Sequence, residues 1–112
     1  MSHKAQQLYT KPVSATRNAA VSFSDELDSG ELLTGTPTVA EVSTSDLTID
    51  NAAVSTAELT INGEAVPIGE AVQFRVAGGV AGTSYDITIS VGTDSTPAQT
   101  LFGKVQLDVD AD

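Results

Sequence analysis

Residues 72–91, which read VQFRVAGGVAGTSYDITISV, decide the fold class of this chain. Val72, Phe74 and Val76 alternate with polar residues, as in a strand with one buried face. The glycine-rich segment 78–82 predicts a loop, because glycine adopts positive φ without steric cost. A second alternating segment follows, with apolar or aromatic residues at Tyr85, Ile87, Ile89 and Val91. The stretch therefore predicts two β-strands joined by a short loop.

The same period-two pattern recurs along the rest of the chain. Strand-like segments separated by turn residues lie at 19–24, 37–42, 47–49, 57–61 and 101–109. Asn62-Gly63 is a strong hairpin signal after one of them, and Pro67 restricts its segment to an edge or a connection. No apolar stripe with the helical period of 3.6 residues is long enough to predict a helix. The pattern predicts an all-β protein, an antiparallel sandwich of about seven short strands.

Tyr85 supports two interpretations. It follows the glycine-rich loop and opens a strand, which is the position of a tyrosine corner, where the hydroxyl binds back to a loop carbonyl. Ile87 would then stand where some sandwich domains carry a disulfide cysteine. An ordinary half-buried strand tyrosine explains the same residues equally well.

The composition excludes several classes of function. The chain has 112 residues, enough for one domain, and 5 Lys and Arg against 15 Asp and Glu give a net charge of −10. Binding of nucleic-acid phosphates needs the opposite surplus, so the body is not expected to bind nucleic acid. The absence of Cys excludes disulfides and thiolate metal sites. A histidine base would have to be His3, close to the N-terminus.

The hydropathy pattern gives no sign of a membrane partner. No stretch approaches the roughly 20 apolar residues of a membrane-spanning helix. The first residues, MSHKAQQLYT, lack the apolar run of a secretory signal. We therefore expect neither membrane insertion nor export.

Charge is distributed unevenly along the chain. Residues 1–18 sum to +3, whereas residues 19–112 sum to −13. We therefore predict a basic N-terminal arm at 1–18 and a sandwich domain at 19–112. The arm is either a solvated tail or a segment that docks on an acidic surface, such as a neighbouring copy. In the second case the partner-binding residues are Lys4, Leu8, Tyr9, Lys11 and Arg17.

The other candidate motifs favour structural interpretations. Asp25, Glu26 and Asp28 could ligate Ca²⁺, but their spacing does not match an EF-hand loop, and a solvated turn is favoured. The carboxylates at 108–112 are interpreted as a solvated tail. Segment 78–82 lacks the Lys-Ser/Thr and the helix of a phosphate-binding loop. No nucleophile with its base can be named, so we expect no enzyme, no cofactor and no metal site.

Two segments resemble a known family. Residues 23–33, FSDELDSGELL, resemble a motif around an LDSGE turn, and residues 72–88 resemble a strand–loop–strand segment containing G-G-x-A-G-T-x-Y. Both occur in this order in small immunoglobulin-like virion proteins of tailed bacteriophages, often labelled fiber–tail adaptor proteins. The resemblance extends over about residues 12–109. The chain departs from the family in lacking a Trp before the acidic turn, where Phe23 is the nearest aromatic, and in a longer central segment at 61–69.

The resemblance implies an immunoglobulin-like sandwich and a structural role without catalytic residues. We expect an adaptor that joins tail or neck and fiber components in a symmetric multi-copy assembly of virion proteins, assembled in the host cytoplasm and located in the virion. A capsid decoration or cement protein is one alternative. A ligand- or carbohydrate-binding module is another, and it is disfavoured because Phe74 and Tyr85 lie on inward stripes instead of forming an exposed aromatic cluster.

Overall fold

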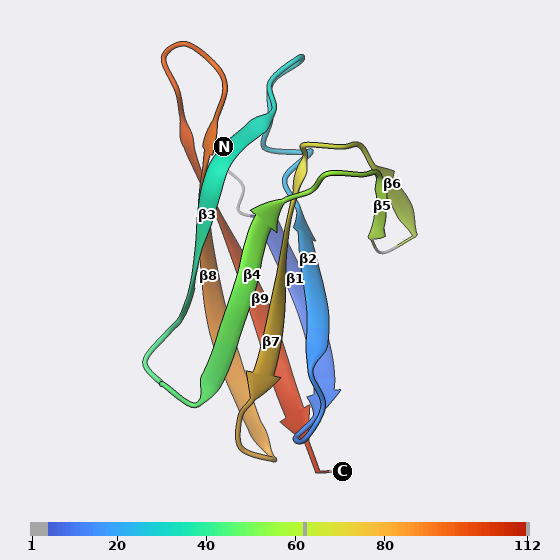
Figure 1. Ribbon diagram of the computed structural model, residues 1–112, viewed down its shortest axis with the longest axis vertical. Helices are drawn as coiled ribbons and strands as arrows, with labels where there is room; N and C mark the ends of the chain where they lie inside the picture. The colour runs from blue at the N-terminus through green and yellow to red at the C-terminus, as the bar shows by residue number, and fades with distance from the viewer. Residues whose placement is uncertain (1–4, 62, 112) are drawn as a thin grey trace.

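The computed structural model describes residues 5–61 and 63–111, and strands joined by turns and loops make up this part of the chain (Figure 1). This confirms the all-β class. The strands are β1 (Ala5–Pro12), β2 (Arg17–Ser22), β3 (Leu33–Glu41), β4 (Leu47–Val54), β5 (Leu59–Ile61), β6 (Glu64–Val66), β7 (Ala71–Gly78), β8 (Thr83–Thr93) and β9 (Thr100–Asp110).

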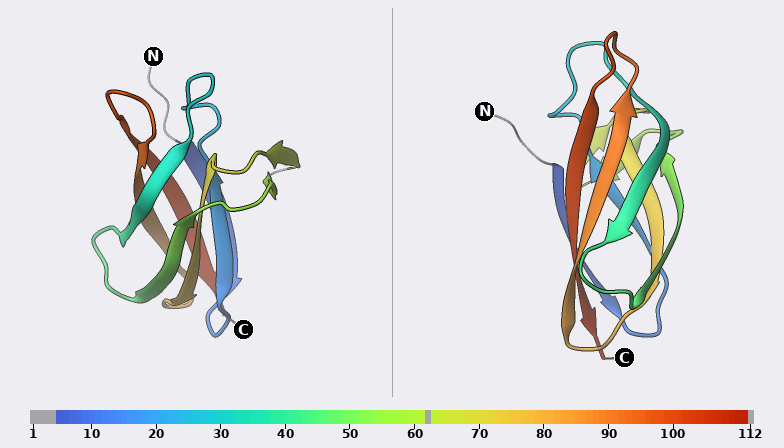
Figure 2. Two further views of the ribbon diagram at one scale, coloured as in Figure 1. Left: turned by 45° about the horizontal axis from the view of Figure 1, so that its top comes forward. Right: turned by 90° about the vertical axis from the view of Figure 1, so that its left-hand side faces the viewer.

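The strands form two main sheets and a separate hairpin. β1, β9, β8 and β3 form a four-stranded sheet in that order, and β2, β7 and β4 form a three-stranded sheet. The two sheets pack face to face (Figure 2), while β5 and β6 form a hairpin beside the three-stranded sheet. The main sheets contain seven strands, as many as predicted, but β1 was not predicted and the predicted strand at 57–61 lies in the separate hairpin. Six of these strands follow the constant-type immunoglobulin order, with β2, β7 and β4 in the places of strands B, E and D, and β3, β8 and β9 in those of C, F and G. β1 departs from it, because it pairs with β9 and not with β2.

β1 corrects the expected domain boundary. It pairs in parallel with β9, with Tyr9 opposite Leu107 and Lys11 opposite Val109. Residues 5–12 are therefore a strand of the sandwich and not part of an arm that ends at residue 18, and β2 already begins at Arg17. The period-two pattern was hard to recognise here because a lysine occupies an inward position of β1. Lys4 lies outside the described residues.

The core lies between the two sheets, where the inward stripes predicted from the sequence meet. Its buried members, each at most 5% exposed, include Ala19, Val21, Phe23, Val72, Phe74, Val76, Tyr85, Ile87, Ile89, Val91, Val105, Leu107 and Val109. Burying one large aliphatic or aromatic side chain of this kind contributes about 1.5–3 kcal/mol. The alternation of the predicted segments at 19–24, 72–76, 85–91 and 101–109 therefore accounts for most of the core.

The segment between β4 and β7 departs from the expected sandwich. The predicted strand at 57–61 is shortened to β5, which turns at Gly63 (φ +81°) into β6 instead of joining a main sheet. The predicted hairpin is confirmed. It is attached through its own small apolar cluster, in which Ile61 and Val66 are buried with Ala71. This hairpin projects beside the three-stranded sheet (Figure 1). Its residues Leu59, Thr60 and Ile61 form one wall of the hollow described below.

Candidate functional site

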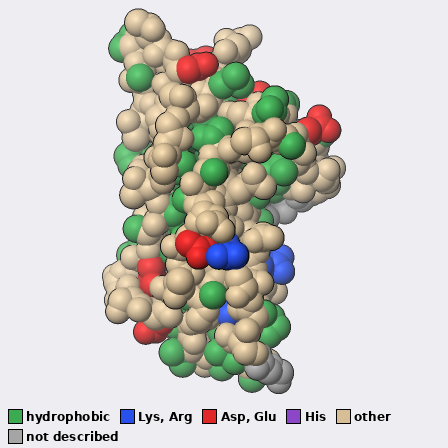
Figure 3. Space-filling model, viewed as in Figure 1, with side chains coloured by type: hydrophobic (Ala, Val, Ile, Leu, Met, Phe, Trp, Pro, Cys, Tyr) green, Lys and Arg blue, Asp and Glu red, His purple; other side chains and the backbone are tan. Residues whose placement is uncertain are grey.

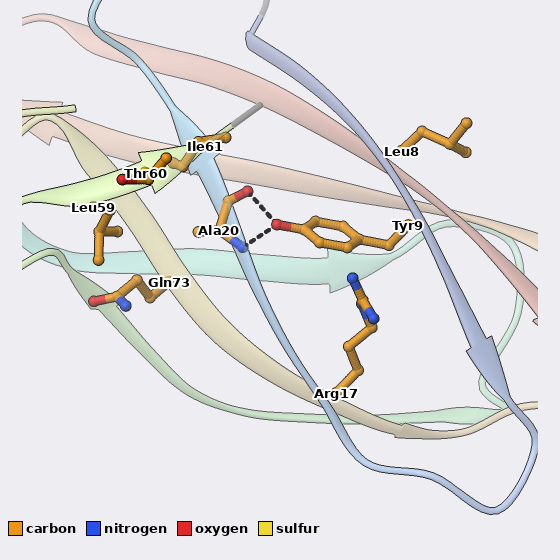
Figure 4. Close-up of a pocket in the computed structure, with 8 residues that line it drawn as sticks. All are labelled: Leu8, Tyr9, Arg17, Ala20, Leu59, Thr60, Ile61 and Gln73. Carbon is orange, nitrogen blue, oxygen red and sulfur yellow. Dashed lines mark hydrogen bonds between the residues drawn. The ribbon is translucent and has the colours of Figure 1, made fainter. Parts of the chain in front are cut away.

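The predicted partner-binding residues do not form one continuous surface. Three of them line a hollow of about 420 Å³ between β1, β2, β7 and the β5–β6 hairpin (Figure 4). β1 contributes Leu8 and Tyr9, and β2 contributes Arg17. No local sequence pattern connects this segment with the hairpin. The complete lining is Leu8, Tyr9, Arg17, Ala20, Leu59, Thr60, Ile61 and Gln73.

Tyr9 closes the open edge of β2. Its hydroxyl donates to the carbonyl of Ala20 at 2.9 Å and accepts from the amide of the same residue at 2.8 Å (Figure 4). The hydroxyl therefore takes the place that a neighbouring strand would fill. The guanidinium carbon of Arg17 lies 4.8 Å from the centroid of the Tyr9 ring, within the range of a cation–π contact. Tyr9 and Arg17 are thus held in a fixed arrangement at the hollow.

Lys11 corrects the predicted set of partner-binding residues. Its side chain is buried, with the whole residue only 1% exposed. The ammonium donates to the carbonyls of Pro12, Val13 and Ala15 at 2.9, 3.0 and 2.9 Å. An ammonium has three donors, and here all three are used by the turn between β1 and β2. Lys11 therefore stabilises this turn and is not available to a partner.

A second hollow, of about 300 Å³, lies on the outer face of the three-stranded sheet. Gln73 lines both hollows, and we call the two together the trough. The second hollow contains a β-bulge, because the pairing of β4 with β7 shifts between Asp50 and Ala53, and Asn51 there has φ +56°. Its lining is Asn18, Ala19, Asn51, Ala53, Gln73, Phe74 and Arg75.

An ion pair neutralises charge beside the trough. Arg75 donates to both carboxylate oxygens of Asp50, from Nε at 2.9 Å and from the second guanidinium nitrogen at 3.0 Å. These hydrogen bonds hold the pKa of Asp50 below its ordinary value of 3.8. Figure 3 shows this face, where an acidic side chain (red) and a basic side chain (blue) lie in contact near the middle of the view. The sequence contained a signal for this pair, since Arg75 stands between the inward residues Phe74 and Val76 and the alternation therefore predicts that it points outward.

The loops at one end of the sandwich form a second candidate surface. The β2–β3, β6–β7 and β8–β9 loops lie at the top of Figure 1. Leu32 is 39% exposed and Ile68 is 56% exposed, and a Cβ added to the neighbouring Gly69 would lie 3.4 Å from the Leu32 side chain. Asp94 fixes Leu32 through two hydrogen bonds of 2.9 Å, one from the Leu32 amide to the carboxylate and one from the Asp94 amide to the Leu32 carbonyl. We call Leu32 and Ile68 the apolar pair.

The acidic turn beside the apolar pair is organised by the carboxylate of Glu31, which no sequence motif indicated. Glu31 is buried and accepts the amide of Asp28 at 2.9 Å, while Gln99 donates to its second oxygen at 3.3 Å. Hydrogen bonds from the Ser95 side chain and the Asp28 backbone lower the pKa of Glu31. Within residues 5–61 and 63–111, Asp25, Glu26 and Asp28 do not belong to any cluster of three residues that could hold a metal ion.

Tyr85 occupies a variant of the tyrosine corner. Its hydroxyl accepts the amide of Val80 at 2.8 Å and donates to the carboxylate of Asp46 at 2.9 Å. The partners are therefore an amide and a carboxylate, and the expectation of a loop carbonyl was wrong. Burial raises the pKa of Tyr85, and the hydrogen bond with Asp46 adds to this effect.

The described part of the chain contains no helix long and apolar enough to cross a membrane.

Comparison with known proteins supports the fold only. No protein-family model and no curated protein matches the chain. One solved structure is similar, that of a nucleoside hydrolase-related hypothetical protein from Saccharophagus degradans that is associated with carbohydrate metabolism. The TM-score is 0.53 at 11% sequence identity, over 93% of this chain. The match spans only 22% of the length of that protein, so it is a similarity between this chain and one part of a larger molecule.

Proposed function

We propose that this chain is a structural protein of a bacteriophage virion, an adaptor that joins tail or neck components to a fiber. The resemblance of residues 23–33 and 72–88 to immunoglobulin-like virion proteins supports this proposal. The structural observation that carries the proposal is the end of the sandwich formed by the β2–β3, β6–β7 and β8–β9 loops, which we call the loop end. There the apolar pair is exposed, and hydrogen bonds between the β2–β3 and β8–β9 loops hold the carboxylates of Glu31 and Asp94 in place.

The loop end has the properties of a docking surface. Protein interfaces combine an apolar centre with a polar rim, and prior ordering of the loops lowers the entropic cost of binding. The rim includes Asp28 and Asp94, so the complementary surface on a tail or fiber subunit carries Lys or Arg around an apolar centre. Each contact is small, and repetition around a symmetry axis supplies the avidity.

The experiment that tests the proposal measures incorporation into particles. Virions carrying the wild-type chain are compared with virions carrying Ile68→Lys, with Val80→Lys as the matched control. Val80 is 53% exposed on the β7–β8 loop at the other end of the sandwich, so both variants place a lysine at a similarly exposed position. We expect Ile68→Lys to abolish incorporation and Val80→Lys to leave it unchanged, as measured by quantitative mass spectrometry of purified particles. Absence of the wild-type chain from the particles would refute the proposal.

A capsid decoration protein remains the second candidate, and copy number separates the two. An adaptor at the tail occurs in a small multiple of the local ring symmetry, whereas decoration places a copy on every capsid unit. A cryo-EM map of the particle distinguishes these arrangements directly.

A further inference from the structure

We propose that the trough on the outer face of the three-stranded sheet is a binding site for a neutral oligosaccharide. This inference is independent of the virion proposal, because the trough has no residue in common with the apolar pair. The two hollows of the trough, about 420 and 300 Å³, are within or at the lower limit of the size range of small-molecule sites. They adjoin at Gln73, so an extended ligand of several rings can occupy both.

Side-chain amides supply the recognition chemistry. Asn18, Asn51 and Gln73 line the trough, and none of the three side chains forms a hydrogen bond with another residue at 5–61 or 63–111. Each amide has two N–H donors and an acceptor oxygen in one plane. A sugar hydroxyl both donates and accepts, so adjacent hydroxyls of one ring can bind such an amide in a bidentate manner. Thr60 adds a hydroxyl from the hairpin wall.

The backbone of Asn51 supports a specific role for its amide. Its φ of +56° is uncommon for a residue other than glycine, and it occurs at a bulge in β4. Bulges redirect side chains, and strained backbone is concentrated at functional sites. The bulge places Asn51 in the lining of the second hollow, together with Asn18 from β2.

Charge indicates that the ligand is neutral. Arg75 is neutralised by Asp50, and the chain as a whole has a net charge of −10, which repels anions at long range. A cationic ligand would be drawn to the exposed carboxylates elsewhere, because the positively charged Arg17 lines the trough. A polyhydroxylated molecule without charge is affected by neither repulsion, and the guanidinium of Arg17 can donate to its oxygens.

The edge of β2 argues against a peptide as the occupant. A peptide that binds beside a sheet usually adds as a further strand through backbone hydrogen bonds. At the trough, the Tyr9 hydroxyl already uses both the amide and the carbonyl of Ala20. The side chains of the lining offer a ligand amides, a hydroxyl and a guanidinium, together with the apolar surface of Leu59 on the hairpin wall.

The test is an NMR titration of the full ¹⁵N-labelled chain with neutral hexasaccharides of glucose and of N-acetylglucosamine. We expect the side-chain amide signals of Asn18, Asn51 and Gln73 to shift on addition of at least one probe. Gln73→Ala should weaken binding about tenfold, because it removes two amide hydrogen bonds. The matched control is Gln106→Ala, an exposed glutamine on the outer face of the other sheet, which should leave the affinity unchanged.

Three outcomes would overturn the proposal. One is that neither probe shifts the amide signals, and a second is that Gln73→Ala binds as well as the wild-type chain. The third is that the same signals shift with protein concentration in the absence of sugar, which would show that a second copy occupies the trough. A hexasaccharide of galacturonic acid is added as an acidic probe. Weaker binding of this probe than of the neutral ones at low salt supports the charge argument, and tighter binding contradicts it.

Discussion

The outer faces of the two sheets differ in how their polar side chains are paired. On the four-stranded sheet, polar side chains bind one another across strands: Lys104 lies 3.5 Å from Asp86, and Ser84 donates to Asp108 at 2.6 Å. On the three-stranded sheet, Arg75 and Asp50 pair in the same way, but the neighbouring amides have no partner among the described residues. The β5–β6 hairpin also lies only beside this second sheet. Among the described residues, the first face pairs charged and polar side chains across strands, whereas the second holds amides without a partner in the trough.

The largest expected effect comes from loosening the hairpin, which is the main difference between the two faces. Ile61 is 8% exposed in the small cluster that attaches the hairpin. Ile61→Ala should lower the free energy of unfolding by about 2 kcal/mol, the lower end of the range for such truncations. Ile68→Ala is the matched control, since Ile68 is 56% exposed and should change stability by no more than about 0.5 kcal/mol.

Denaturant titration measures both hairpin variants, and hydrogen exchange locates the effect. We expect faster exchange at β5 and β6 with little change at β8 and β9. Equal destabilisation by the two variants would show that the hairpin does not depend on its buried cluster.

The next effect compares two lysines of the four-stranded sheet. Lys11→Met keeps an unbranched side chain but leaves the carbonyls of Pro12, Val13 and Ala15 without the ammonium, which should cost about 1–3 kcal/mol. Lys104→Met, on the open face, loses only an exposed ion pair and should cost less than about 1 kcal/mol. Thermal unfolding of the two variants provides the measurement. A larger loss for Lys104→Met would contradict the structural role assigned to Lys11.

A smaller effect is expected at the edge of β2. Tyr9→Phe keeps the ring beneath Arg17 and removes only the hydroxyl that binds Ala20, at a cost of about 1 kcal/mol. It also frees an edge amide and carbonyl, so we expect the variant to self-associate at high concentration. Leu8→Ala, at an exposed neighbouring position, is the control. Analytical ultracentrifugation tests the comparison, and a monomeric Tyr9→Phe would show that the hydroxyl does not protect this edge.

The contrast between the faces also explains which features the sequence could predict. The inward stripes of β7, β8 and β9 were recognised because burial on one face imposes a period of two. β1 was missed because Lys11 and Tyr9 take inward positions, and only the three-dimensional arrangement shows that their polar ends bind backbone groups. The trough was not predictable, since it joins residues of β2, β4 and β7 to a hairpin whose position no local pattern specifies.

The smallest expected effect is on how the stability of the chain depends on pH, and it compares one ion pair from each face. The hydrogen bonds from Arg75 lower the pKa of Asp50 below 3.8 in the folded chain. A carboxyl with a lowered pKa in the folded state binds protons more readily when unfolded, so its stabilising contribution is present above pH 3.8 and is lost as the pH falls through the folded pKa. Asp50→Asn lacks this contribution at every pH, and the variant and wild type should therefore converge in stability in strong acid.

Asp86→Asn supplies the matched variant on the other face, where the contact with Lys104 is a single one of 3.5 Å. Both carboxylates are about half exposed, with side-chain exposures of 44% for Asp50 and 50% for Asp86, so solvent screens both pairs to a similar extent. The two-point geometry of Arg75 with Asp50 is then the main difference, because bidentate pairing is the stronger form. Urea titrations of both variants between neutral pH and strong acid should show a larger pH-dependent gap from the wild type for Asp50→Asn. A larger gap for Asp86→Asn would mean that the open face holds the tighter pair, and the comparison between the two faces would have to be reversed.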